Sequence, residues 1–133
     1  MTPGAPDGDD APEAPAFGES FARRALHWDA AYSVAVGLAI AAFASSIEQH
    51  LDVSAWVVAT TGTGAVAWAG VLAWLARRPE WRQSAGIAAV VNGVFALAVT
   101  RWAVSLGGSS GVILGLLALQ VAGFAVAQGA SAR

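Results

Sequence analysis

Four long stretches of the chain contain no charged residue, and this feature constrains the fold more than any other. They cover residues 30–47, 53–76, 83–100 and 102–132. A helix that crosses a bilayer needs roughly 20 predominantly apolar residues. The stretches show neither the alternation of β-strands nor the charged outer face of helices in a soluble protein. We therefore predict an all-α fold, a bundle of four transmembrane helices with spans near residues 28–47, 54–76, 84–105 and 110–129.

The composition supports this interpretation and excludes several classes of function. Charged residues make up 12% of the chain, against about 25% in a typical soluble domain, so the expected partner is the lipid bilayer. The net charge is −2 and no lysine is present, which argues against a nucleic-acid surface. The absence of cysteine excludes disulfides, thiolate metal sites and thiol catalysis.

Residues 1–19 differ from the rest of the chain. They contain four of the five prolines and five of the nine acidic residues. Such a segment cannot bury enough apolar surface to offset its chain entropy, so it is predicted to be a disordered tail. Residues 20–133 then form the transmembrane domain.

The arginines predict the orientation of the spans. Six of the seven fall on one side of the expected topology: Arg23, Arg24, Arg77, Arg78, Arg82 and Arg133. Arginine and lysine are enriched in cytoplasmic loops, so both termini are expected in the cytoplasm of a bacterial cell, with the protein in its inner membrane. A cleaved signal peptide is the alternative for the first span, but the long acidic tail and Asp29 argue against it.

Each predicted span carries a stripe of small residues, spaced so that they share one helix face. Close backbone contact at small residues drives helix association in lipid. We expect these stripes to face the bundle interior, with bulky residues on the opposite faces. The stripes are Ala30, Ser33, Gly37, Ala41 and Ala44; Ala59, Thr63, Ala67 and Gly70; Ala85, Ala88, Ala89, Asn92, Ala96 and Ala103; and Gly111, Gly115, Ala118, Ala122, Ala125 and Gly129.

Four polar residues within or beside the spans are candidates for packing or for a solute pathway: Asn92, Gln120, Thr63 and Arg101. For Asn92 we expect an interhelical hydrogen bond, with a substrate contact as the alternative. Thr63 can bond to a carbonyl of its own helix. Arg101 is expected to extend to the headgroups, or to pair with Glu48 or Asp52.

Gln120 is predicted to lie about 180° from the small-residue stripe of its own helix. Its amide needs a hydrogen-bond partner in hydrocarbon. One hypothesis is a bond across a homo-oligomer interface. The other turns the helix so that Gln120 meets Asn92 or Thr63 within one chain.

No carboxylate is expected in mid-membrane, because His27 and Asp29 are interpreted as solvated residues at the inner interface. In this respect the chain departs from small four-helix proton-coupled drug antiporters. It contains no Ser-His-Asp set, HExxH, P-loop or GxGxxG motif. We therefore expect no enzymatic activity, no cofactor, no metal and no identifiable small-molecule ligand. A structural or accessory membrane protein is the leading hypothesis, and a small-solute transporter or channel subunit is the alternative.

The sequence resembles a group of small, uncharacterised four-helix bacterial integral membrane proteins. The similar features are the segments 23–26 and 72–79, Asp29 at the start of the first span, Asn92 and Gln120. The resemblance covers roughly residues 21–129. It implies the inner membrane and this topology, and it carries no activity.

Overall fold

The computed structural model describes residues 17–51 and 53–133, which are helical apart from short connections and the last two residues. The helices are α1 (Phe17–Ala42), α2 (Ala44–Leu51), α3 (Ala55–Leu75), α4 (Trp81–Leu106) and α5 (Gly108–Ser131). No strand occurs in this described part of the chain. The all-α prediction is therefore confirmed.

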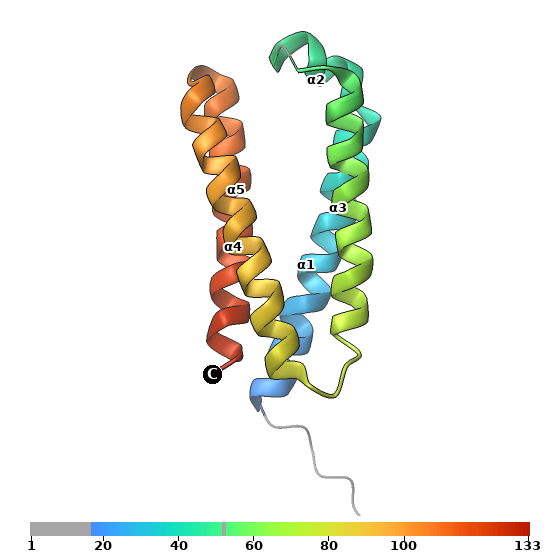
Figure 1. Cartoon of the computed structure of the whole chain (residues 1–133), viewed down its shortest axis with the longest axis vertical. Coiled ribbons are helices and arrows are strands. Elements are labelled where there is room, and N and C mark those ends of the chain that lie inside the picture. The colour runs from blue at the N-terminus through green and yellow to red at the C-terminus, as the bar shows by residue number, and fades with distance from the viewer. Residues whose placement is uncertain (1–16, 52) are drawn as a thin grey trace, which may run out of the picture.

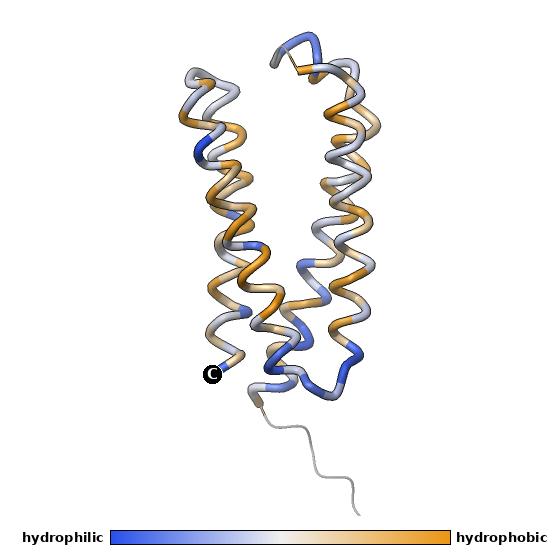
Figure 2. Tube along the Cα trace, in the orientation of Figure 1, coloured by the Kyte–Doolittle hydropathy of each residue, from blue (hydrophilic) through white to orange (hydrophobic). Residues whose placement is uncertain are grey.

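Four of the helices, α1, α3, α4 and α5, are long and apolar enough to cross a membrane. Hydrophilic residues are concentrated towards the ends of the helices, and apolar residues cover most of their length (Figure 2). The observed α3, α4 and α5 differ from the predicted spans by one to three residues at their ends, which is within the usual uncertainty of helix boundaries. Four helices of this length and composition are compatible with a multi-pass membrane protein.

The first span differs most from its prediction. Helix α1 begins at Phe17, so residues 17–19, assigned above to the tail, are helical. It ends at Ala42, where a turn at Phe43 leads into the short α2. The remainder of the predicted tail, residues 1–16, lies outside the described residues.

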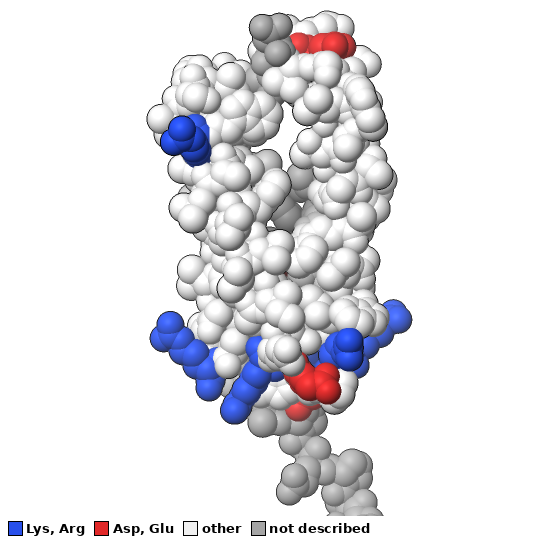
Figure 3. Space-filling view, in the orientation of Figure 1, with Lys and Arg blue, Asp and Glu red and all other residues white. Residues whose placement is uncertain are grey.

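The long helices form two antiparallel hairpins, α1 with α3 and α4 with α5 (Figure 1). The hairpins approach each other at the end where α1 begins and the chain terminates, and they diverge towards the end where α2 lies. The four long helices therefore form an open pair of hairpins, which does not confirm the four-helix bundle predicted above. Most of the arginines gather at the end where the hairpins meet (Figure 3).

Glycines bring α1 and α3 into backbone contact. A Cβ atom added at Gly37 would lie 2.6 Å from the carbonyl oxygen of Gly62, and one added at Gly62 would lie 2.5 Å from that of Gly37. No side chain fits at such a contact, so these two glycines set the distance between the helices.

The face predicted for the second span is wrong. Its expected stripe includes Thr63, Ala67 and Gly70, all of which are exposed. The buried residues of α3 are instead Val58, Gly62, Ala69, Leu72 and Leu75. The inward face thus mixes small and bulky residues, which a search for small residues alone does not find.

The stripe predicted for α4 is confirmed, since Ala85, Ala88, Asn92, Ala96 and Ala103 are all buried. In α5 the agreement is partial. Gly111 packs on α4, because a Cβ there would lie 2.6 Å from the carbonyl oxygen of Ala103, whereas Gly115 has open space around it.

The α4–α5 connection is a sharp reversal at Gly107 and Gly108, which have positive φ values of 61° and 56°. Glycine adopts this conformation without the steric cost that a Cβ imposes. The chain therefore turns directly from α4 into α5.

Candidate functional site

Asp29 is buried inside the helix assembly, which corrects its interpretation as a solvated interfacial residue. Only 3% of Asp29 is exposed, and its neighbours Asn92 and Gln128 are 4% and 0% exposed. Six residues separate Asp29 from Arg23, which is about 9 Å of helix at 1.5 Å per residue. A buried carboxylate therefore lies within one of the long apolar helices, near the end that carries Arg23.

The side chains around Asp29 all donate hydrogen bonds to it. Its Oδ2 accepts one from Asn92 Nδ2 at 2.5 Å and one from Gln128 Nε2 at 2.8 Å. Its Oδ1 accepts a longer one from Ser33 Oγ at 3.4 Å. An ionised carboxylate accepts hydrogen bonds and donates none, so these three donors offset part of the cost of burying a charge at this position.

The cluster draws one or more polar side chains from each of the four long helices. Trp68 of α3 donates from Nε1 to Asn92 Oδ1 at 3.3 Å. Asn92 of α4 also donates from Nδ2 to Gln128 Oε1 of α5 at 3.0 Å. We call Asp29, Ser33, Trp68, Asn92 and Gln128 the polar node. Hydrogen bonds within the polar node join the two hairpins.

An apolar core separates the polar node from the end where the arginines gather. Its buried members are Leu26, Ala30, Ala69, Leu72, Ala76 and Ala88, and Trp68 packs against them. Beyond this core, Arg23 donates to the carbonyl oxygens of Ala76 and Arg78, just after α3, and pairs with Glu19 at 2.9 Å. That is the only ion pair among the described residues, so no cationic side chain there neutralises Asp29.

On its other side the polar node borders a cleft between the diverging hairpins. The cleft has a volume of about 940 Å³, and the gap between the hairpins is visible in the space-filling view (Figure 3). Ser33 lines the cleft and also donates to Asp29, so it connects the two. Most of the wall is apolar and comes from all four long helices; it includes Val36, Ile40, Val57, Phe95, Ile113 and Leu117.

Tyr32 and Gln120 bridge the hairpins at the cleft wall. The Tyr32 hydroxyl of α1 donates to Gln120 Oε1 of α5, and the ring of Tyr32 contacts that of Phe124 with centroids 5.6 Å apart. Gln120 therefore has a partner within its own chain, but this partner is neither Asn92 nor Thr63. The Tyr32 hydroxyl supplies a partner for the amide oxygen of Gln120, and the bond across a homo-oligomer interface stays a prediction.

The structure does not bring Thr63 to the polar node. Thr63 is exposed on α3, and its hydroxyl donates to the carbonyl oxygen of Ala59 at 2.9 Å. The expected bond to its own helix is confirmed.

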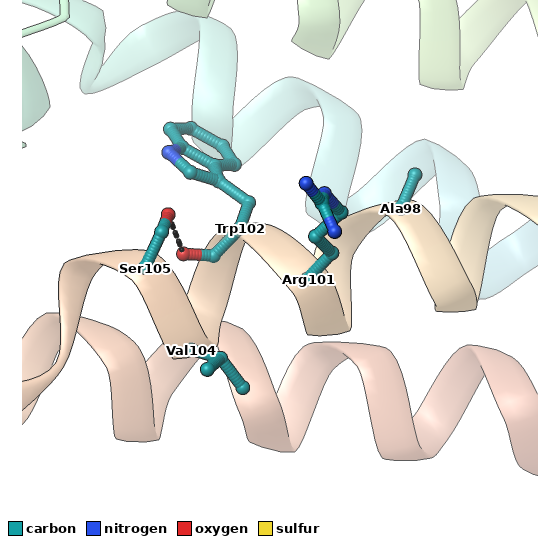
Figure 4. A pocket seen from close by; sticks show the side chains of 5 residues that line it. All are labelled: Ala98, Arg101, Trp102, Val104 and Ser105. Atoms are coloured by element: carbon teal, nitrogen blue, oxygen red, sulfur yellow. Dashed lines mark hydrogen bonds between the residues drawn. The ribbon is translucent and has the colours of Figure 1, made fainter.

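Arg101 also lies away from the polar node. It lines a surface hollow on α4 with Ala98, Trp102, Val104 and Ser105 (Figure 4). Arg101 is exposed, and it forms no ion pair with Glu48. The other expected partner, Asp52, lies outside the described residues.

The sequence predicts Asn92 in the interior, and its burial confirms this prediction. The sequence analysis did not identify the neighbours of Asn92 in the polar node, which are Asp29, Ser33, Trp68 and Gln128. One signal for Asp29 was present. Asp29, Ser33 and Gly37 follow one another at intervals of four, so Asp29 shares the predicted inward face of its helix. No comparable signal identified Gln128, which lies at the end of its predicted span.

No group of His, Cys, Asp and Glu side chains suited to a metal ion occurs among the residues that the structure describes. Comparisons with protein-family models, with curated proteins and with solved structures found no match.

Proposed function

We propose that the chain is a multi-pass protein of the bacterial inner membrane, with both termini in the cytoplasm, that moves a small solute or ion by way of Asp29. The observation that carries the proposal is the burial of this carboxylate within the membrane-spanning helices, beside an open cleft. The orientation is supported by the gathering of arginines at the end where the hairpins meet.

The energetic cost of Asp29 argues for a role beyond packing. An acidic residue at the centre of a membrane helix costs about 2.5–3.5 kcal/mol to insert. An asparagine or serine would accept hydrogen bonds from Asn92 and Gln128 without that cost. Ionisable residues inside membrane proteins commonly mark proton relays and ion pathways, and Asp29 has the position of such a residue.

A structural or accessory role, in which the protein packs with itself or with a partner, is the second candidate. It is favoured by the completeness of the polar node, since no buried polar side-chain atom of the described residues lacks a hydrogen-bond partner. On this hypothesis the polar node only holds the two hairpins together.

Asp29→Asn distinguishes the two candidates, because it removes the charge and keeps a hydrogen-bond acceptor at the same position. The purified protein is reconstituted into proteoliposomes and adsorbed on a solid-supported membrane. A step from pH 7 to pH 5 should produce a transient current in the wild type, as protons bind to and move through the protein. Asp29→Asn should lose most of this current and should retain its melting temperature within a few degrees.

Thr63→Val serves as the control, since Thr63 contacts neither the polar node nor the cleft, and its current should equal that of the wild type. Equal currents in the wild type and in Asp29→Asn would overturn the transport proposal in favour of the structural role.

The orientation is tested by cysteine labelling, for which the chain is convenient because it contains no cysteine. His50→Cys lies in α2 and Glu80→Cys lies in the α3–α4 connection, at opposite ends of the molecule. In intact cells an impermeant thiol reagent should label position 50 and leave position 80 unlabelled until the cells are lysed. The reverse pattern would place the termini outside.

A further inference from the structure

The cleft between the hairpins has a mostly apolar wall, and the buried carboxylate of Asp29 lies behind Ser33 at its closed end. Apart from Thr61, its polar lining groups are concentrated in two places. Ser46, His50, Ser109 and Ser110 lie near the wide end, while Tyr32, Ser33 and Gln120 lie where the hairpins converge. Between them the wall consists mainly of aliphatic and aromatic side chains.

The cleft is large enough for a small organic molecule. Sites for such molecules typically have volumes of roughly 300–1,000 Å³ and are mostly apolar, with a few polar groups that orient the ligand. The volume of about 940 Å³ falls in this range, and the three polar groups at the narrow end could orient a ligand.

The charges around the cleft favour a positively charged ligand. None of the described residues that line it is an arginine or a lysine. Asp29 lies directly behind Ser33, whose Oγ is 3.4 Å from Asp29 Oδ1, and no cationic side chain of the described residues pairs with it. Because the surroundings are apolar, water screens this charge less than it would at a surface.

We propose that the cleft binds an amphipathic organic cation, with the apolar body between the hairpins and the positive group at the narrow end. The cationic group lies beside Ser33 and Gln120 Oε1 and is attracted by Asp29. The Tyr32 ring, which packs on Phe124, forms the floor against which the ligand rests. The proposal deepens the proposed function by naming a class of solute, and it rests on the same carboxylate.

Tetraphenylphosphonium and tetraphenylborate provide a matched pair of probes, since their apolar bodies are nearly identical and their charges are opposite. Binding of each is measured by isothermal titration calorimetry on the full chain in mild detergent, with protein-free micelles subtracted. We expect tetraphenylphosphonium to bind at least tenfold more tightly than tetraphenylborate. In Asp29→Asn its affinity should fall by roughly tenfold or more.

Two neighbouring threonines of α3 provide a matched pair of variants for the location of the site. Both are exposed and both bond to carbonyl oxygens of their own helix, Thr60 to Trp56 at 2.7 Å and Thr61 to Val57 at 2.8 Å. Thr61 lines the cleft and Thr60 does not. Thr61→Trp should weaken tetraphenylphosphonium binding by occupying part of the cleft. Thr60→Trp should leave binding unchanged, and both proteins should retain their helical circular dichroism.

Several results would overturn this inference. Equal affinities for the two probes would mean that the cleft selects no charge, and equal effects of the two tryptophans would place binding elsewhere. A co-purified lipid that tetraphenylphosphonium cannot displace would show that the cleft holds an acyl chain. Charge-selective binding without the pH-step current would support the cation site and overturn the transport proposal. A pH-step current without binding would support the transport proposal and overturn the cation site.

Discussion

The two ends of the helix assembly are held together in different ways. At the end where the arginines gather, the hairpins contact each other through an apolar core and the polar node. At the other end the hairpins stand apart, and each is held by its own close contacts, Gly37 with Gly62 in one and Gly111 with Ala103 in the other. Interactions between hairpins are therefore concentrated at one end, and those within hairpins extend along the helices.

This difference follows from the physics of helices in lipid. Apolar side chains gain little by leaving lipid for another apolar surface, so helix association depends on close packing and on interhelical hydrogen bonds. The open end has close packing within each hairpin, and its polar side chains form no hydrogen bond between the hairpins among the described residues. The cleft is therefore open at the end that lacks such bonds and closed at the end that has them.

The largest loss of stability is expected where the backbones of α1 and α3 touch. Gly62→Leu places a side chain against the carbonyl oxygen of Gly37 and should force α1 and α3 apart, at a cost of about 3 kcal/mol or more. Thermal unfolding in detergent should show a large fall in melting temperature or no folded protein. Gly64→Leu is the control, since Gly64 has open space around it, and a similar fall there would contradict the glycine contact.

The next largest loss of stability is expected at the end where the hairpins meet. Asn92→Leu removes the donor to Asp29 and Gln128 and the acceptor for Trp68. Buried polar groups left without partners cost about 1–3 kcal/mol, so the melting temperature should fall clearly. Val91→Leu, on an exposed face of the same helix, should change it little. An unchanged melting temperature in Asn92→Leu would mean that the polar node does not hold the hairpins together.

A smaller effect is expected from Trp68→Phe. The substitution removes the 3.3 Å hydrogen bond to Asn92 and keeps an aromatic ring against the apolar core. The loss should be about 0.5–1.5 kcal/mol, together with a change in tryptophan fluorescence. A loss of stability as large as that of Asn92→Leu would show that the packing of the indole ring stabilises the fold more than its hydrogen bond does.

The smallest effect is expected at Thr63, which belongs to neither end. Thr63→Val removes a hydroxyl that bonds only to its own helix and should change the free energy of unfolding by less than about 0.5 kcal/mol. Thermal unfolding measures this directly, and a larger loss would reveal a contact of Thr63 outside the single chain.

Much of the candidate site could not be predicted from the sequence. Asn92 was placed correctly because it interrupts a regular stripe of alanines on a strongly patterned helix. The inward face of α3 was not predicted correctly, because its inward residues Val58 and Leu72 are as bulky as those on its outer face. In lipid both faces of a helix are apolar, so the contrast that reveals the buried face of a soluble helix is weak.

The sequence by itself determined the four long helices, because largely apolar segments of this length satisfy their backbone hydrogen bonds in lipid as helices. It also determined which end carries the arginines. Only the tertiary structure decided the role of Asp29. Its carboxylate lies about 9 Å along the helix from Arg23, a position that permits either hydration or burial. Asn92 and Gln128, which lie 63 and 99 residues away in the chain, come from the other hairpin to bury it.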